Sequence, residues 1–390
     1  MTSNERNNDI VIVGGGIYGA ALAFDLATAG LGVTLLEADE IAAGASGGPG
    51  ERGVRAVNRD IRELPIAALA QERWKELQQT VEGGVGYRRI GGIQVFDRPF
   101  GHRLSEIQAV LHVRAEVQNA MGIPTRVVSG DELREMEPEL SASIGGGLFC
   151  PNDGVGDHTL ATRQIAREAG KAGAAIRTGA KAIELLRSGR TINAVKLAGG
   201  ETVPVGRHLL LMANRGAPAL LKPLLQADER LPVWEFIPQM QYVSNPEKRT
   251  INHLLSHMHR RLAVKQLTDG TVMLSGGWTV ERVAEGGTSG ALGAMSLNVQ
   301  DSIATFPFLE RSEFLKVDHS RVETCTLDGI PLIGRPAAVD NLTYGLGWSG
   351  HGFAISLGMS RLIADWVITG NRPPLLAPFS PARFNPPAAK

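Results

Sequence analysis

A glycine-rich turn near the start of the chain constrains its fold more than any other feature. The turn is Gly14-Gly15-Gly16-Ile17-Tyr18-Gly19, which fits the pattern G-x-G-x-x-G. The run Ile-Val-Ile-Val at 10–13 is short, apolar and β-branched, which is typical of a strand buried in a parallel sheet. Residues 17–29 are rich in Ala and Leu and favour a helix, and a second strand is expected at 32–36. This order predicts a right-handed βαβ unit.

Each glycine of the pattern has a physical role in binding a dinucleotide. The first allows the tight turn, the second lets the backbone approach a pyrophosphate, and the third packs the helix against the strand. The helix N-terminus offers the phosphates free N–H groups and a partial positive charge. Glu37 ends the second strand, where it can accept hydrogen bonds from a ribose, and it would repel the 2′-phosphate of NADP.

The motif by itself leaves NAD and FAD open as the dinucleotide. The residues assigned to this part of the site are Gly14, Gly16, Ile17, Tyr18, Gly19, Glu37 and Ala38.

Composition excludes several other classes of protein. The 390 residues are enough for two or three domains, and 40 Lys and Arg balance 40 Asp and Glu. This balance argues against a nucleic-acid or acidic-membrane partner. Two cysteines, Cys150 and Cys325, cannot build a disulfide framework. Because the start is polar and no apolar run approaches about 20 residues, we expect a cytoplasmic protein without a secretory signal or membrane span.

Helices and strands are expected along the rest of the chain. Asp157 is a favourable N-cap for a helix that ends near Gly173. Further helices are expected at 62–80, 101–121 and 353–369, and further strands at 92–96, 174–178, 192–197, 202–205 and 209–212.

Three later motifs resemble those of one family of flavoproteins. Gly44-Ala45-Ser46-Gly47, followed by Arg52-Gly53-Val54-Arg55, resembles the loop after the second strand in the D-amino-acid oxidase and sarcosine oxidase family. Residues 328–334, Asp-Gly-Ile-Pro-Leu-Ile-Gly, are similar to its D-G-x-P-x-I-G turn. Residues 347–353, Gly-Trp-Ser-Gly-His-Gly-Phe, are similar to its G-x-S-G-H-G-F loop near the flavin ring. The resemblance extends from residue 9 to about 370.

The resemblance implies a two-domain α/β protein that binds FAD non-covalently. A Rossmann-type FAD-binding domain, similar to that of glutathione reductase, would pair with an α+β substrate domain built on a mixed or antiparallel sheet. The covalent cysteine of sarcosine oxidases would fall at Arg321, and Cys325 comes too late in the chain. The predicted FAD-binding domain comprises 1–83, 151–222 and 323–390, and the predicted substrate domain comprises 84–150 and 223–322.

The resemblance also implies the reaction and further flavin contacts. Backbone N–H groups of the 347–353 loop would stabilise the negative charge of the reduced flavin, much as an oxyanion hole does. A hydride would pass from the carbon beside an amine nitrogen to flavin N5, and the imine would hydrolyse in water. Ala182 falls where the family usually has a valine whose backbone contacts adenine. The other flavin-binding residues implied by the resemblance are Gly44, Ala45, Ser46, Arg52, Gly53, Gly347, Gly350, His351, Gly352 and Phe353.

Two substrate anchors of the family are missing from this sequence. Ala354 stands where sarcosine oxidases have a lysine, and Glu323 stands where amino-acid oxidases have an arginine. These changes disfavour a simple glycine-like or D-amino-acid substrate, and Glu323 favours a cationic or larger polar amine. Arg52 and Arg55 match an arginine pair of sarcosine oxidases. They contact either the flavin or a substrate carboxylate, or else they form a surface ion pair or an FAD phosphate contact.

The candidates for catalysis are Arg55, His351 and Lys265. His351 has either a role beside the flavin or a structural one within its loop. Sarcosine oxidases use a lysine of the substrate domain to activate O2; an alignment places Leu274 there, while Lys265 lies on a neighbouring expected strand. Trp278 is a candidate wall of the substrate pocket, along with Arg55 and Glu323, although core packing would also explain it.

No metal site is expected. His253, His257 and His259 form H-x-x-x-H-x-H, but the glutamate of the zinc-peptidase motif H-E-x-x-H is missing. Solvated or hydrogen-bonded histidines are the favoured interpretation.

We therefore predict an FAD-dependent oxidoreductase that oxidises the C–N bond of a secondary amine or amino acid derivative. The electron acceptor is O2 or another carrier, with a slight preference for a dehydrogenase. One alternative is a flavin-binding, beta-type subunit of a heteromeric amine, opine or hydroxyproline dehydrogenase that is active only with partner chains. A second alternative is an NAD-dependent dehydrogenase.

Overall fold

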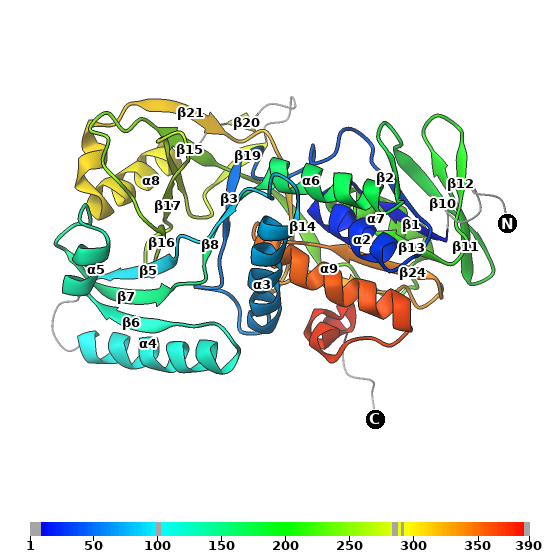
Figure 1. Ribbon diagram of the computed structural model, residues 1–390, viewed down its shortest axis with the longest axis horizontal. Helices are drawn as coiled ribbons and strands as arrows, with labels where there is room; N and C mark the ends of the chain where they lie inside the picture. Colours follow the sequence, from blue (N-terminus) through cyan, green and yellow to red (C-terminus); the bar gives the residue numbers. More distant parts are fainter. Residues whose placement is uncertain (1–8, 99–102, 283–287, 290–291, 386–390) are drawn as a thin grey trace.

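The protein consists of two parts that lie side by side (Figure 1). The computed structural model describes residues 9–98, 103–282, 288–289 and 292–385. One part is built on a six-stranded sheet and the other on an eight-stranded sheet. The expected fold class, a Rossmann-type domain with a second α/β domain, is confirmed.

The six-stranded sheet begins with the βαβ unit around the glycine turn. Its strand order is β23-β24-β13-β1-β2-β9, and the neighbours from β24 to β9 pair in parallel, while β23 is antiparallel to β24. Its strands are β1 (Ile10–Val13), β2 (Val33–Leu36), β9 (Ala175–Arg177), β13 (His208–Leu211), β23 (Leu332–Gly334) and β24 (Leu342–Leu346). Segments far apart in the chain therefore meet in one sheet, as a doubly wound fold requires.

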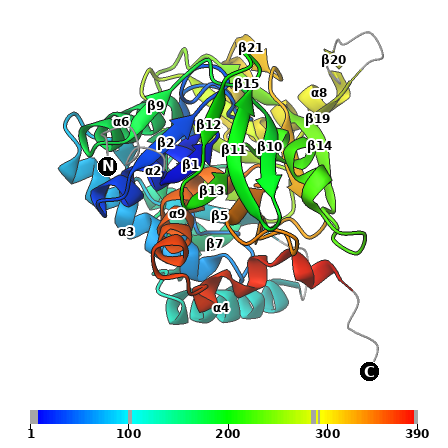
Figure 2. The same cartoon turned by 90° about the vertical axis from the view of Figure 1, so that its right-hand side faces the viewer.

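The two faces of this sheet are covered by different elements. Because side chains alternate along a strand, Ile10 and Ile12 face the helices, whereas Val11 and Val13 join a second core. That second core includes residues of a three-stranded meander, which Figure 2 shows in front of β1 and β13. The meander is formed by β10 (Ala182–Ser188), β11 (Thr191–Leu197) and β12 (Thr202–Pro204), and the short helix α7 (Ala217–Leu221) packs beside it.

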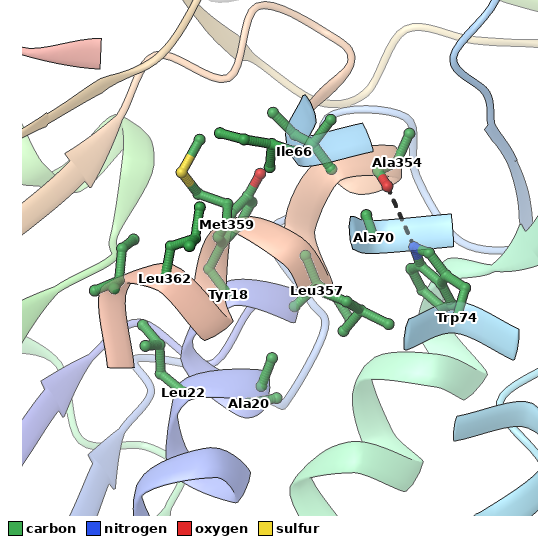
Figure 3. Close-up of a cluster of buried hydrophobic side chains, with 14 of the residues drawn as sticks. Tyr18, Ala20, Leu22, Ile66, Ala70, Trp74, Ala354, Leu357, Met359 and Leu362 are labelled. Carbon is green, nitrogen blue, oxygen red and sulfur yellow. Dashed lines mark hydrogen bonds between the residues drawn. The ribbon is translucent and has the colours of Figure 1, made fainter. Parts of the chain in front are cut away.

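A layer of helices covers the first face of the sheet. Helix α2 (Ile17–Thr28) packs directly on β1 and β2, α6 (His158–Lys171) and α9 (Gly352–Thr369) pack on α2, and α3 (Leu64–Thr80) packs on α9. Figure 3 shows buried side chains of α2, α3 and α9, with Nε1 of Trp74 donating to the carbonyl of Ala354 at 3.3 Å. A Cβ on Gly358 would come within 2.5 Å of the Ile66 carbonyl oxygen. Helices α3 and α9 can therefore cross this closely only because residue 358 is glycine.

The eight-stranded sheet forms the second part of the protein. Its order is β21-β15-β18-β17-β16-β5-β7-β6, and all neighbours are antiparallel except β5 and β16. Its strands are β5 (Gly92–Asp97), β6 (Arg126–Ser129), β7 (Ile144–Cys150), β15 (Met240–Val243), β16 (Leu254–His257), β17 (Ala263–Gln266), β18 (Val272–Ser275) and β21 (Phe314–Asp318). Its helices are α4 (Arg103–Ala120), α5 (Gly130–Met136) and α8 (Leu292–Thr305).

Two smaller sheets lie where the two parts meet (Figure 1). One joins β3 (Glu51–Val54), β4 (Tyr87–Arg88) and β8 (Gly154–Asp157). The other joins β14 (Val233–Pro238), β19 (Thr279–Arg282), β20 (Thr288–Ser289) and β22 (Glu323–Thr326). Both sheets combine segments that we assign to different domains, so they connect the two domains through backbone hydrogen bonds. The domain limits themselves stay a prediction.

The expected helices and strands match the observed ones with small shifts at their ends. The first two residues of the helix expected at 101–121 lie outside the described residues. Helix α9 is apolar and long enough to cross a membrane, but 67% of that stretch is buried inside the protein. It packs as a core helix.

The N-cap of α6 provides a direct test of local stability. The carboxylate of Asp157 accepts a hydrogen bond from the Leu160 N–H at 2.8 Å, as the sequence predicted. Asp157→Ala should lower the free energy of unfolding by about 1 kcal/mol, because a helix N–H loses its acceptor. Urea denaturation measures this change. Asp157→Asn keeps an acceptor and should cost little; equal losses in the two variants would contradict the capping role.

Candidate functional site

The glycine turn is built so that a phosphate group can approach its backbone. Gly14 has φ +113°, and a Cβ there would lie 2.6 Å from the Met212 carbonyl oxygen. A Cβ on Gly19 would collide with the carbonyl oxygen of Gly14. Beside Gly16, by contrast, the space is open, and the N-terminus of α2 has neither a side-chain cap nor an acidic residue in its first turn. The turn therefore leaves N–H groups and space for an anion.

Glu37 lies next to this turn, as the motif predicts. Its Oε2 accepts a hydrogen bond from the Gly15 N–H at 2.5 Å, and its Oε1 accepts from the Asp39 N–H at 2.9 Å. Its backbone carbonyl accepts from the Ala180 N–H, so the segment that leads into β10 and Ala182 runs beside the ribose position. Ala38 is exposed next to it. The predicted adenosine contacts therefore come together at one edge of the sheet.

Glu323 joins the two later glycine loops. Its carboxylate accepts from Ser46 Oγ at 2.6 Å and from Asn214 Nδ2 at 3.1 Å. Oδ1 of Asn214 in turn accepts from the Gly347 N–H at 3.0 Å. The loop of Gly44, Ala45 and Ser46 and the loop of Gly347–Phe353 are thus tied through one buried carboxylate.

These hydrogen bonds change the interpretation of Glu323. Every contact of its carboxylate is with a side chain or backbone N–H of the loops, including Thr324 N at 2.8 Å. Its role in binding a cationic amine stays a prediction. Sequence reasoning missed Asn214, whose φ of +40° is the only local sign that its conformation is unusual.

Lys265 lies with Arg52 and Arg55 where the two parts of the protein meet. Lys265 is only 6% exposed, and burial, followed by the nearby charges of Arg52 and Arg55, lowers its pKa to about 7. Burial also lowers the pKa of Arg55, to about 10. The structure thus brings together three cations from two distant segments of the chain.

The register of the sheet explains why Lys265 and not Leu274 faces these arginines. Lys265 pairs with Met273, and Met273 pairs with Tyr242, so these three side chains share one face. Leu274 pairs with Val264 and packs in the core on the opposite face. Leu274 therefore lies on the opposite face of the sheet from Lys265, and a role of Lys265 in activating O2 stays a prediction.

A cleft of about 320 Å³ opens near these cations. Its lining includes residues 49–52, Tyr242 and Lys316, and the Lys316 ammonium lies 4.5 Å from the centre of the Tyr242 ring. Nη1 and Nη2 of Arg52 donate to backbone carbonyls, whereas its buried Nε has no partner among the described residues. Arg52 and Tyr242, which lies on the same face of the sheet as Lys265, both line this cleft, whereas Lys265 itself does not.

Asp153 supports the segment that carries Arg55, and sequence reasoning missed it. This fully buried carboxylate accepts from the N–H groups of Ala56 at 2.6 Å and Val57 at 3.1 Å, and from Gln71 Nε2 at 2.7 Å. Burial raises its pKa. No local sequence pattern marks it, because these partners come from two segments far from Asp153 in the chain.

His351 contacts two buried charged residues that the sequence did not indicate. Its Nδ1 lies 2.9 Å from Nη1 of Arg59 and 3.4 Å from Oε1 of Glu63. Its neighbour Phe353 packs against Trp74 and His158, and Trp348 stacks on Tyr18 with ring centres 3.6 Å apart. The motif loop is therefore held by aromatic and charged contacts from other elements.

Trp278 and the histidine motif lie elsewhere in the second part of the protein. Nε1 of Trp278 donates to the Arg261 carbonyl at 2.8 Å, so its role as a pocket wall stays a prediction. His257 belongs to strand β16, and its Nδ1 accepts from the N–H groups of His259 and Arg260. His253 contacts Glu137 at 2.8 Å. These histidines are held by hydrogen bonds within the protein.

Two glycine substitutions should distinguish a glycine needed for FAD binding from a glycine needed for the packing of the turn. Gly16→Ala puts a methyl group into open space, so we expect an unchanged melting temperature of the FAD-free protein and weaker FAD binding. Gly19→Ala forces a Cβ against the Gly14 carbonyl, so both quantities should fall. Thermal denaturation and fluorescence titration with FAD measure them. Unchanged FAD affinity in Gly16→Ala would contradict this placement of the phosphates.

Comparisons with known proteins agree with this geometry. The family model of the FAD dependent oxidoreductases (DAO) matches residues 9–366. The chain is 23% identical to the sarcosine oxidase subunit beta of Arthrobacter sp. over 97% of this chain and 92% of that protein. It is 25% identical to a D-amino acid dehydrogenase of Methylobacterium nodulans over 80% and 71% of the two chains.

A solved structure supports the fold. The crystal structure of L-proline dehydrogenase from P. horikoshii superposes with a TM-score of 0.83 at 22% identity, covering 97% of this chain and 98% of the other. The open space at Gly16, the uncapped N-terminus of α2 and the position of Glu37 fit FAD, and the family match decides between FAD and NAD in favour of FAD. The chain belongs to the DAO family of FAD-dependent oxidoreductases.

Proposed function

We propose that this protein oxidises the C–N bond of a secondary amine or amino acid derivative to an imine, which hydrolyses in water. FAD supplies the hydride acceptor when it is bound. The observation that carries the proposal is the group formed by the buried Lys265 and the half-buried Arg52 and Arg55 at the junction of the two parts. Relatives named for sarcosine, D-amino acids and L-proline support an amine substrate.

The cation group also suggests how a substrate carboxylate is bound. Burying positive charge is costly unless an anion faces it. Glu51 acts on Lys265 electrostatically, but burial together with Arg52 and Arg55 outweighs it and lowers the pKa of Lys265 to about 7. Arg55 and Lys265 would supply the attraction that Ala354 and Glu323 do not. We therefore favour an amine that carries a carboxylate over a purely cationic amine.

The backbone of the 347–353 loop has a separate role in the proposal. Gly350 has φ +79°, and Gly347 has φ +76° with a Cβ position blocked by Thr326. These positive φ angles turn the loop sharply. The N–H groups of Gly347, Ser349 and His351 donate to acceptors within the protein, so only the other N–H groups of the loop are left for a cofactor. We propose that these groups stabilise negative charge on the reduced cofactor, while Trp348 and Phe353 anchor the loop on the core.

The main test is a visible spectrum of the purified protein followed by a screen of amines. We expect a yellow protein whose colour is bleached without O2 by secondary amines or amino acids. Burial raises the pKa of Cys325 to about 11, which keeps its thiol unreactive, so acid precipitation should release the flavin into the supernatant. A colourless protein that takes up no FAD would overturn the proposal, and a yellow pellet would contradict non-covalent binding.

Lys265 provides a test of the electron acceptor. If O2 is the acceptor, Lys265→Met should slow reoxidation of the reduced enzyme by O2 about 10²-fold, because a charge that stabilises developing negative charge is lost. In the unmodified enzyme, the rate of reoxidation by O2 should fall as the pH rises through about 7, since Lys265 then loses its proton. Stopped-flow mixing with O2 measures both effects.

Lys316→Met is the matched control for this experiment. It removes the same charge from an exposed position in the lining of the cleft, and it should leave the rate of reoxidation by O2 nearly unchanged. If the unmodified enzyme is reduced rapidly by an amine but reoxidised slowly by O2, then another carrier accepts the electrons. Equal reoxidation rates in all three proteins would remove Lys265 from the reaction.

A flavin-binding subunit of a larger enzyme is the second candidate function. Its support is the similarity to a protein named as a sarcosine oxidase subunit beta over nearly the full chain. Amine oxidation that appears only after a second chain is added to the purified protein would favour this candidate.

A further inference from the structure

A buried charged cluster beside the flavin loop has no role in the proposal above. Arg59 and Glu63 come from the segment that leads into α3, and His351 precedes the first residue of α9. The side chains of Arg59 and Glu63 are 3% and 1% exposed, whereas that of His351 is 31% exposed. His351 therefore lies between a buried ion pair and the open side of the loop.

Arg59 bridges all parts of this cluster. Its Nη1 donates to Oε2 of Glu63 at 3.2 Å and lies 2.9 Å from Nδ1 of His351. Its Nη2 donates to the His351 carbonyl at 3.0 Å, and its Nε donates to the Arg55 carbonyl at 2.6 Å. A guanidinium can only donate, so Nδ1 of His351 accepts in this arrangement and Nε2 carries the hydrogen.

Glu63 offers the same ring nitrogen a second partner. Its Oε1 is buried, has no hydrogen-bond partner among the described residues, and lies 3.4 Å from Nδ1 of His351. A buried carboxylate oxygen without a partner is rare and calls for an explanation. If Nδ1 instead carried a hydrogen, it would face this oxygen and satisfy it.

The charges around the cluster set the balance between the two arrangements. Although burial by itself raises the pKa of Glu63, the contacts with His351 and Arg59 lower it below its usual value, so Glu63 is ionised. Arg55 interacts electrostatically with Arg59 and Glu63, and so does Tyr18 from α2. Glu323 on β22 acts electrostatically on Tyr18. Burial raises the pKa of Tyr18, so its phenol stays neutral.

We propose that Arg59 and Glu63 compete for Nδ1 of His351 and thereby decide whether its Nε2 donates or accepts a hydrogen. With Arg59 on Nδ1, Nε2 carries the hydrogen and is a donor. With Nδ1–H turned to Glu63, the lone pair of Nε2 is free, and Glu63 balances the positive charge when His351 takes up a proton. Glu63 and Arg59 are positioning residues that act through His351.

The second arrangement gives His351 a defined step in amine oxidation. An ammonium substrate must lose a proton before the carbon beside its nitrogen can give up a hydride. The N–H bond of the ammonium breaks, its electron pair stays on nitrogen, and a new N–H bond forms at Nε2. This step rests on the proposed function, whereas the competition for Nδ1 does not.

The test follows the titration of His351 by ¹⁵N NMR in the FAD-loaded protein with labelled histidine, the signal being assigned by its loss in His351→Asn. Glu63→Gln removes the carboxylate, so His351 should lose its proton at a pH at least one unit lower, a tenfold loss of proton affinity. Arg59→Gln removes the competing cation, so the titration should move in the opposite direction.

Three further variants guard against indirect effects. Glu76→Gln changes the same charge on an exposed position of α3 and should leave the titration in place. Glu63→Asp and Arg59→Lys keep the charges, so the pH at which His351 loses its proton should remain close to that of the unmodified protein. Arg59→Lys replaces Arg59→Gln in the experiment if Arg59→Gln does not fold. Shifts of Glu63→Gln and Arg59→Gln in the same direction, or no shift in Glu63→Gln, would overturn the proposal.

The readout needs no substrate, so it can fail independently of the proposed function. If the NMR titration behaves as expected but no amine reduces the flavin, the competition of Arg59 and Glu63 for Nδ1 is supported and the proposed amine oxidation is contradicted. If an amine is oxidised, the acid limb of its pH profile should move to lower pH in Glu63→Gln and not in Glu76→Gln.

Discussion

The buried carboxylate of Asp153 holds together the segments on which the site depends. The carboxylate fixes the backbone of Ala56 and Val57 and binds Gln71 on α3. The backbone carbonyl of Asp153 accepts from the N–H of Gly91, which directly precedes β5. The first part of the protein, its helix layer and the eight-stranded sheet therefore meet at one residue. Because a buried ion is costly unless its hydrogen-bonding groups are satisfied, this geometry tolerates little movement. It positions the segment that presents Arg55 and Arg59.

Close backbone approach is the second constraint on this molecule. Glycine is required at positions as different as the turn at Gly14, the crossing of α3 and α9 at Gly358, and the flavin loop at Gly347. Only some of these positions concern the cofactor. A Cβ at Gly358 would separate two helices, whereas a Cβ at Gly16 would meet only open space in the protein. Gly358 therefore serves the packing of the two helices, whereas the role of Gly16 in binding the cofactor stays a prediction.

The charges at the site follow a consistent division of roles. Buried carboxylates are used within the protein: Glu323 joins two loops, Asp153 holds a third, and Glu63 pairs with Arg59. The cation Lys265 has no such partner among the described residues. A site whose carboxylates contact partners within the protein, and whose cation makes no ion pair, is suited to an anionic ligand.

The sequence alone determined the glycine turn, the ribose carboxylate and most helices and strands, because these depend on local backbone geometry and on the alternation of apolar residues. It also indicated the family, through motifs in loops whose backbone must come close to the cofactor. Only the tertiary structure decided that Lys265 shares a face of the sheet with Met273 and Tyr242 while Leu274 is in the core, since successive residues of a strand point to opposite faces. It also decided that Glu323 joins loops and that Arg59, Glu63 and Asp153 surround them, because such partners come from segments far apart in the chain, and no local pattern records which buried charges will meet.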